Sequence, residues 1–93
     1  MLERYTLSSD NTLMPTIYRY KGYRFFFFSN EGNPPEPPHV HVRHGENVAK
    51  FWLTPDVRLA DAWGMTPTEL NELQKVTQEN RGDFERAWHE FFD

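Results

Sequence analysis

The fold is decided by residues 16–28, which read TIYRYKGYRFFFF. Two runs of β-branched and aromatic residues flank Lys21-Gly22, a pattern typical of a β-hairpin closed by a short glycine-containing turn. Side chains alternate between the two faces of a strand, so the four consecutive phenylalanines at 25–28 are divided between both faces. Both faces of this strand therefore need cover, either from the rest of the fold or, on one face, from a partner.

A second hairpin is expected after a proline-rich connection. Residues 29–38 read SNEGNPPEPP, and this content of proline, glycine and asparagine favours a loop. Residues 39–44 (HVHVRH) and 48–53 (VAKFWL) are strand-like runs on either side of the turn Gly45-Glu46-Asn47, so they should pair antiparallel. Residues 57–63 (VRLADAW) fit either a further short strand or an irregular return.

The last third of the chain changes to helical periodicity. Residues 66–69 (TPTE) have the form of a capping box with proline at the first helical position, which predicts a helix over 67 to about 79. Residues 80–83 (NRGD) resemble a second cap before a helix over about 81–92, whose apolar stripe should pack on the sheet. One kinked helix in place of two is the alternative. Strands followed by helices predict an α+β domain: an antiparallel sheet of about four strands, in two hairpins, packed by one or two C-terminal helices.

Length and composition restrict the class of protein. A chain of 93 residues is sufficient for one domain, which we place at 14–93 after an N-terminal extension at 1–13. The absence of cysteine excludes disulfides, thiolate zinc sites and a cysteine nucleophile. No segment has the form of a signal peptide or approaches the length of an apolar membrane span, so a cytoplasmic protein without membrane contact is expected.

The net charge of −4 is unevenly distributed. Residues 15–58 carry six basic and four acidic side chains, whereas residues 59–93 carry three basic and eight acidic ones. The acidic total argues against non-specific binding of nucleic acid, but a locally basic surface on the first half of the domain stays open.

Alternation also divides the strand at 39–44 between two faces. Val40 and Val42 match the apolar positions of the next strand, at 49, 51 and 53, so they should face the core. The opposite side then carries a polar and aromatic set, which consists of His39, His41 and Arg43 together with Lys50 and Trp52 of the neighbouring strand.

This set suits a negatively charged ligand. Two histidines can act as general base and general acid near neutral pH, and adjacent cations can stabilise charge that develops on a phosphate. The candidate catalytic residues of a metal-independent ribonuclease are therefore His39, His41 and Arg43, and the candidate RNA-binding residues are Lys50, Trp52 and Arg24. An ordinary solvated strand face is the alternative.

The His-x-His pattern also suits a metal ion, because two imidazoles on one strand face can share it. A third ligand would have to come from Glu36, Glu46 or His89 through the tertiary fold. Cations on the same face oppose a divalent cation, so no metal ligand and no cofactor is assigned. Whether the chain is an enzyme is left open.

The chain carries a set of short motifs at Met14-Pro15-Thr16-Ile17, Pro37-Pro38-His39-Val40-His41-Val42 and Gly45, followed by Glu79-Asn80-Arg81 and Trp88. These motifs, which cover residues 14–92, resemble those of small bacterial proteins classified as domain of unknown function 4160. The family has no established activity. Its members often lie beside another small uncharacterised gene, so the resemblance implies a toxin–antitoxin-like two-gene module.

The function predicted from these observations is a component of such a module that acts by binding a protein or a nucleic acid through its sheet. A metal-independent ribonuclease toxin and a histidine-based metal-binding protein are the alternatives. The expected partners are a protein from the neighbouring gene, RNA, or a second copy of the chain in a homodimer.

Overall fold

The computed structural model of this chain describes residues 16–28 and 36–93. Over these residues it contains five strands and two helices: β1 (Thr16–Tyr20), β2 (Tyr23–Phe26), β3 (His39–His44), β4 (Asn47–Trp52), β5 (Arg58–Trp63), α1 (Pro67–Glu79) and α2 (Arg81–Phe92). The strands form one antiparallel sheet in the order β1-β2-β3-β4-β5. The predicted N-terminal extension at 1–13 and most of the predicted loop at 29–38 lie outside the described residues.

The predicted α+β class is confirmed, with one strand more than expected. The additional strand is β5, formed by the segment that the sequence left open between strand and irregular return. It lies at the edge of the sheet, and five of its six residues are exposed, which explains why no clear pattern of buried positions marks it. The C-terminal segment forms two helices, with Asn80 between them.

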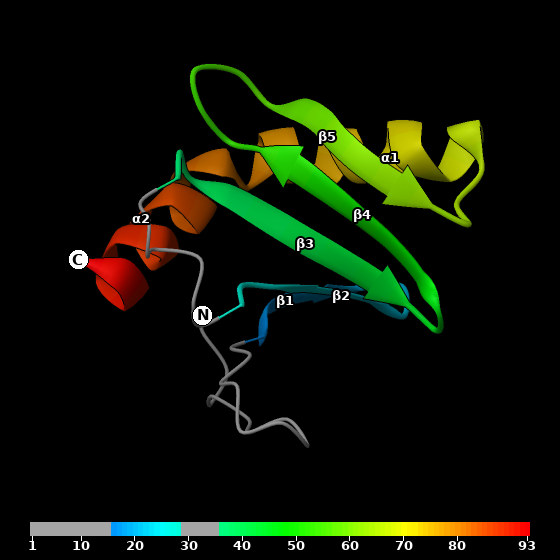
Figure 1. Ribbon diagram of the computed structural model, residues 1–93, viewed down its shortest axis with the longest axis horizontal. Helices are drawn as coiled ribbons and strands as arrows, with labels where there is room; N and C mark the ends of the chain where they lie inside the picture. Colours follow the sequence, from blue (N-terminus) through cyan, green and yellow to red (C-terminus); the bar gives the residue numbers. More distant parts are fainter. Residues whose placement is uncertain (1–15, 29–35) are drawn as a thin grey trace.

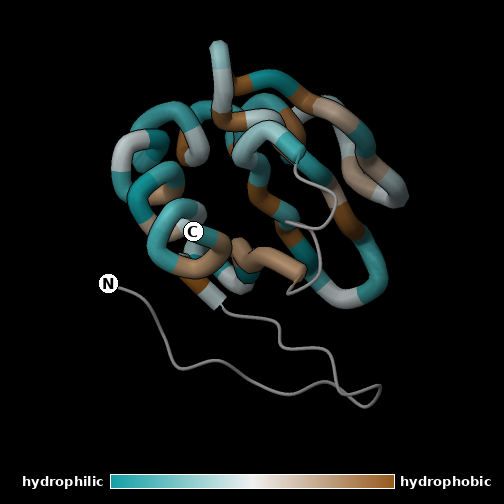
Figure 2. Tube along the Cα trace, turned by 60° about the vertical axis from the view of Figure 1, so that its left-hand side comes forward, coloured by the Kyte–Doolittle hydropathy of each residue, from teal (hydrophilic) through white to brown (hydrophobic). Residues whose placement is uncertain are grey.

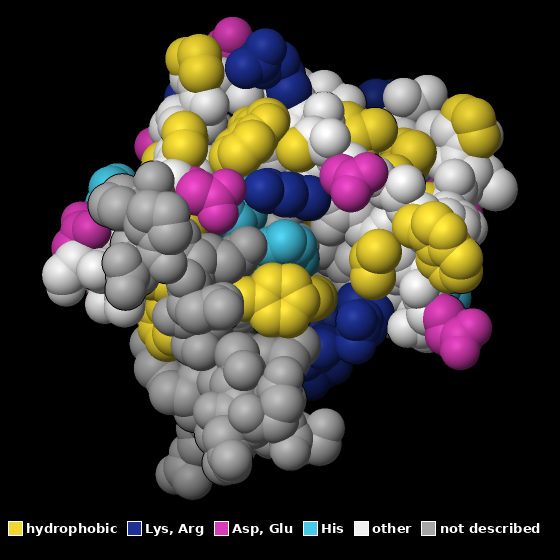
Figure 3. Space-filling view, in the orientation of Figure 1, with side chains coloured by type: hydrophobic (Ala, Val, Ile, Leu, Met, Phe, Trp, Pro, Cys, Tyr) yellow, Lys and Arg dark blue, Asp and Glu magenta, His cyan; other side chains and the backbone are white. Residues whose placement is uncertain are grey.

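Both helices cover the same face of the sheet. In Figure 1 they lie behind the strands, with α1 against β4 and β5 and α2 against β3. Hydrophobic and hydrophilic residues alternate along the strands in Figure 2, as expected for a sheet with one covered face. The other face, which we call the outer face, is turned toward the viewer in Figures 1 and 3.

The core forms between the sheet and the helices as the alternation predicts. Val40 and Val42 of β3 are fully buried, and they pack in one cluster with the apolar side chains of β4 and the helices. The other main members of the cluster are Ile17, Phe25, Phe27, Ala49, Phe51, Leu53, Val57, Leu73, Val76, Phe84, Ala87 and Trp88.

The four consecutive phenylalanines are divided between the two faces. The ring centroid of Phe25 lies 5.5 Å from that of Phe84, and Phe27 lies 5.3 Å from Trp88, so both pack against α2. Phe26 is only 1% exposed although it is on the outer face, where its ring neighbours include Phe28 at 5.2 Å. The expectation that both faces of this strand are covered therefore agrees with the structure.

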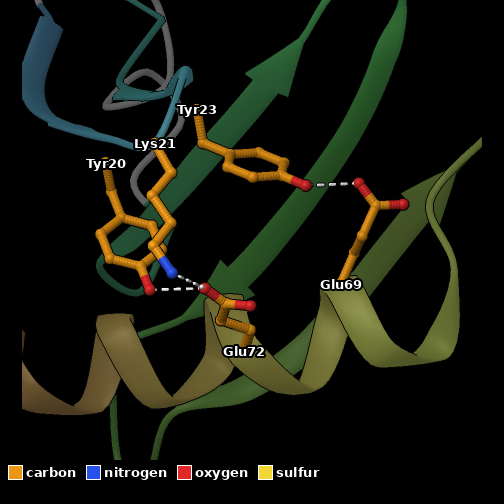
Figure 4. A network of polar contacts seen from close by, with 5 residues as sticks. All are labelled: Tyr20, Lys21, Tyr23, Glu69 and Glu72. Carbon is orange, nitrogen blue, oxygen red and sulfur yellow. Dashed lines mark hydrogen bonds and ion pairs between the residues drawn. The ribbon is translucent and has the colours of Figure 1, made fainter.

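A group of polar contacts joins the β1–β2 turn to α1 (Figure 4). The hydroxyl of Tyr20 donates to Glu72 and the hydroxyl of Tyr23 donates to Glu69, both at 2.5 Å, and Lys21 Nζ lies 3.3 Å from Glu72. Glu69 is also the acceptor of the predicted capping box, because its other oxygen accepts the backbone N–H of Thr66 at 2.9 Å. One carboxylate thus both caps α1 and anchors the hairpin.

These contacts shift the pKa values of their members. The backbone N–H of Thr66 and the hydroxyl of Tyr23 lower the pKa of Glu69 below its usual value. The hydrogen bond from Tyr20 and the ammonium of Lys21 lower the pKa of Glu72 in the same way. The hydrogen bond to Glu69, burial and the two negative charges raise the pKa of Tyr23 to about 12.

We expect Glu69→Gln to reduce the loss of stability in acid. A carboxyl group whose pKa is lowered by folding contributes stability that is fully present above its unfolded pKa of about 4.3. That contribution is lost as the pH falls through the lower folded value. Glutamine retains the capping-box geometry but does not titrate, so the urea midpoint of the variant should fall less between pH 7 and pH 3 than that of the parent. Glu79→Gln, which removes an exposed carboxylate at the other end of α1, is the control, and equal pH dependence in all three proteins would contradict the assignment.

Candidate nucleic-acid interface

The strand register determines which side chains share the outer face. Because Val40, Val42, Ala49 and Phe51 face the core, their neighbours along each strand face outward. In β5 one extra residue, Ala60, interrupts the pairing with β4, so Arg58 and Asp61 both lie on the outer side. The main residues of the outer face are Arg19, Arg24, Phe26, His41, Arg43, Val48, Lys50, Trp52, Arg58, Asp61 and Trp63.

Three arginines stand side by side across β1, β2 and β3. Arg19 pairs with Arg24, and Arg24 pairs with Arg43, so the three form one row across neighbouring strands, which we call the arginine row. Adjacent strands are about 4.8 Å apart, so the row covers about 10 Å of the sheet. Arg19 and Arg43 are exposed, while Arg24 donates to the hydroxyl of Thr16 at 3.2 Å and lies 4.7 Å from the ring centroid of Phe26.

Aromatic rings lie directly beside the arginine row. His41 is paired with Phe26 across β2 and β3; their ring centroids are 5.6 Å apart and the rings are nearly parallel. Phe28 meets the edge of the same imidazole at 4.7 Å. We call Phe26, Phe28 and His41 the aromatic cluster; Phe28 and His41 remain partly exposed.

Lys50 and Trp52 continue the surface on β4. The ammonium of Lys50 lies 4.3 Å from the ring centroid of Trp52 and 3.4 Å from a carboxylate oxygen of Glu36. A cation above an aromatic ring is attracted by the electron density of the ring face, so this lysine is held close to the sheet. Lys50 is also paired in register with Asp61 of β5, across a small hollow of about 110 Å³.

The position of His39 differs from the sequence-based expectation. Alternation placed its side chain on the outward side, yet the residue is fully buried. Its ring lies 4.8 Å from Trp88 of α2, 5.4 Å from Trp52 and 5.2 Å from His41, and Nδ1 lies 3.0 Å from the carbonyl oxygen of Pro37. His39 is the first residue of β3, where α2 reaches the end of the sheet, so a helix covers a position that strand alternation alone would leave open.

The structure brings most of the predicted site residues onto one face and adds others. His41, Arg43, Lys50, Trp52 and Arg24 all lie on the outer face. Sequence reasoning missed Arg19, Phe26 and Asp61 as members of the same surface. Arg19 had a usable signal, because a two-residue turn at Lys21-Gly22 pairs residue 19 with residue 24. Asp61 had none, because its orientation depends on the bulge in β5.

Charge is separated between the two sides of the domain. Among the described residues, the outer face carries five basic side chains, Arg19, Arg24, Arg43, Lys50 and Arg58, against Asp61 and, at its margin, Glu36. Residues 67–93, which form the helices, carry three basic and seven acidic side chains. Figure 3 shows basic, histidine and hydrophobic side chains side by side on the outer face. A negatively charged ligand is therefore favoured on the sheet side and disfavoured on the helix side.

The metal-binding alternative gains no support from the part of the chain that the structure describes. Across residues 16–28 and 36–93, no three side chains of histidine, cysteine, aspartate or glutamate lie close enough together to hold a metal ion. His39 and His41 are neighbours, and aromatic rings pack against both of them.

We expect His39→Ala to destabilise the fold much more than His41→Ala. Removal of the buried ring leaves a cavity between Trp52 and Trp88 and should lower the free energy of unfolding by about 2–4 kcal/mol, measured by urea denaturation. His41 is partly exposed, so its truncation should cost less. Equal losses for the two variants would contradict a structural role for His39.

No helix in the described residues is long and apolar enough to cross a membrane.

Comparison with known proteins identifies the family and no further relative. No curated protein and no solved structure matches the chain. The model of the domain of unknown function DUF4160 matches residues 22–89, a span that runs from the β1–β2 turn to near the end of α2 and includes β3 and most of the outer face. The chain therefore belongs to the DUF4160 family.

Proposed function

We propose that this chain binds single-stranded nucleic acid across the outer face of its sheet. The observation that carries the proposal is the arginine row, which runs directly beside the aromatic cluster. Proteins that bind single strands combine cations that contact the phosphates with rings on which the bases stack. Both kinds of group are present here on one side of the domain and at neighbouring positions of the sheet.

The dimensions of the surface fit this function. The arginine row covers about 10 Å, enough for two consecutive phosphates of an extended strand. The partly exposed rings of Phe28, His41 and Trp52 lie on the side of the row where the bases would be. Each stacked base contributes about 1–3 kcal/mol, and because every base has an aromatic face, stacking alone is tolerant of sequence.

The acidic helices support this orientation. A strand of phosphates is repelled from the helix side and attracted to the sheet side, so the charge separation selects the face that binds. The acidic net charge of the whole chain is therefore compatible with a local site for nucleic acid.

The geometry favours binding of nucleic acid over cleavage of RNA. A ribonuclease that uses two histidines needs both imidazoles to reach the substrate, and His39 is enclosed by Trp52, Trp88 and His41. His41 is partly exposed and Arg43 is exposed, so the catalytic roles predicted for these residues stay a second proposal. Intact RNA after prolonged incubation, read on a denaturing gel, would rule it out.

A protein partner is the other candidate, and a separate observation favours it. Trp63 is 66% exposed and Leu59 is 42% exposed, both on the edge strand β5. Membership of a two-gene module, which the family resemblance implies, would supply such a partner from the neighbouring gene. The arginine row lies toward the other edge of the sheet, across β1, β2 and β3.

We expect Arg43→Ala to weaken binding of a fluorescent single-stranded RNA of about 12 nucleotides, a length within the usual site sizes. Loss of one phosphate contact should raise the dissociation constant about fivefold and reduce the slope of affinity against salt by about one, measured by fluorescence anisotropy. A single-stranded DNA of the same sequence shows whether the sugar matters.

Lys75→Ala, which removes an exposed cation from α1 on the helix side, is the matched control and should leave binding unchanged. The proposal fails if the parent protein binds neither nucleic acid, or if the two variants weaken binding equally.

A further inference from the structure

A second feature of the outer face is the hollow of about 110 Å³ between β4 and β5. It is lined by His41, Val48, Ala49, Lys50, Asp61 and Ala62. His41, Lys50 and Asp61 belong to one row across three strands, since His41 pairs with Lys50 and Lys50 pairs with Asp61. The ammonium of Lys50 and the carboxylate of Asp61 therefore line the hollow from paired positions on adjacent strands.

The two charged groups are held in place by other partners. One oxygen of the Asp61 carboxylate accepts the backbone N–H of Ala62 at 2.9 Å, which orients the group. The ammonium of Lys50 is held by the ring of Trp52 and pairs with Glu36; within residues 16–28 and 36–93 it forms no ion pair with Asp61. The ammonium has three N–H donors, and a carboxylate offers about four lone-pair positions, so both groups keep capacity for a ligand.

We propose that this hollow reads the edge of a guanine base. Guanine presents two neighbouring donors, N1–H and the N2 amino group, followed by the acceptor O6. A carboxylate can accept both donors in parallel, and an ammonium beside it can donate to O6. Asp61 and Lys50 provide these two groups from adjacent strands.

Other bases fit this pair of groups less well. Adenine turns the lone pair of N1 toward the carboxylate, and cytosine does the same with N3. Uracil has one N–H between two acceptors, so it cannot fill both carboxylate oxygens. None of these bases offers two parallel donors to the carboxylate, so each leaves at least one of its oxygens without a base donor, and a site built to pair with polar groups discriminates against such ligands.

The surroundings supply a surface for the rest of the base. The hollow admits the edge of a base but not a whole nucleotide. Trp63, two residues after Asp61 on the same strand and paired with Val48, is 66% exposed on the outer face. An exposed indole beside a polar hollow is a stacking platform, which gives this large apolar side chain a role at the surface.

The inference rests on the proposed function, because the arginine row brings a nucleic-acid strand to this face.

The first experiment compares uridine-rich RNAs of about 12 nucleotides that carry one central guanosine, adenosine, inosine or 7-deazaguanosine. Guanine should bind about tenfold more tightly than adenine. Inosine lacks the N2 amino group and should lose most of this preference, whereas 7-deazaguanine changes only the far side of the base and should bind like guanine.

Asp61→Asn is the test of the site itself. It is isosteric, its side-chain oxygen can still accept the N–H of Ala62, and it replaces one acceptor by a donor, so the preference for guanine over adenine should disappear while binding of the adenine RNA is retained. Asp83→Asn, which makes the same change on α2, away from the hollow and its partners, is the control and should keep the preference. Equal binding of the four RNAs, or a preference that survives Asp61→Asn, would overturn the guanine assignment and leave the proposed function standing.

A second measurement separates the two proposals. Guanosine monophosphate, added to ¹⁵N-labelled protein, should shift the amide resonance of Ala62, which bonds to Asp61, and adenosine monophosphate should not. A guanosine-specific shift without RNA binding would remove the proposed function but support the hollow as a guanine site. The absence of any difference between the two nucleotides would count against the hollow.

Discussion

Trp88 of α2 packs on both Phe27, directly after β2, and His39, at the start of β3. It is 4% exposed and also lies 4.2 Å from the ring of Phe92, so one side chain joins two strands and the last turn of the helix. These contacts hold α2 against one face of the sheet, so the side chains on that face form the core. Because side chains alternate, the composition of the outer face follows from the same contacts.

The proposed function depends on the strand register. Arg19, Arg24 and Arg43 form a row only because β1, β2 and β3 are aligned as they are. The turn at Lys21-Gly22, where both residues have positive φ, sets the alignment of the first pair. A shift of one residue would turn these cations toward the core and expose the apolar residues, so burial of the core keeps the cations on the outer face.

Two acidic residues of α1 have a structural role on the side away from the proposed ligand. Glu69 and Glu72 bind the two tyrosines of the hairpin turn, and Glu69 also caps the helix. Two of the carboxylates are thereby engaged in joining the helix to the sheet, while the cations are gathered on the outer face. The same separation gives the domain a basic and an acidic side.

The amino-acid sequence by itself determined the features that depend on local pattern. The capping box at 66–69, both hairpins and the core positions of Val40 and Val42 follow from periodicity and turn chemistry, which act between near neighbours in the chain. Three features were decided by the tertiary structure alone: the burial of His39, the orientation of Asp61 and the formation of β5 at the edge. The burial of His39 depends on a distant segment, since α2 folds over the start of β3, and the other two features depend on how β5 pairs with β4 through a bulge. Neither leaves a periodic signal in the chain: His39 and Trp88 are far apart in sequence and meet only once the helix has packed on the sheet, and a bulge interrupts the alternation from which strand faces are predicted.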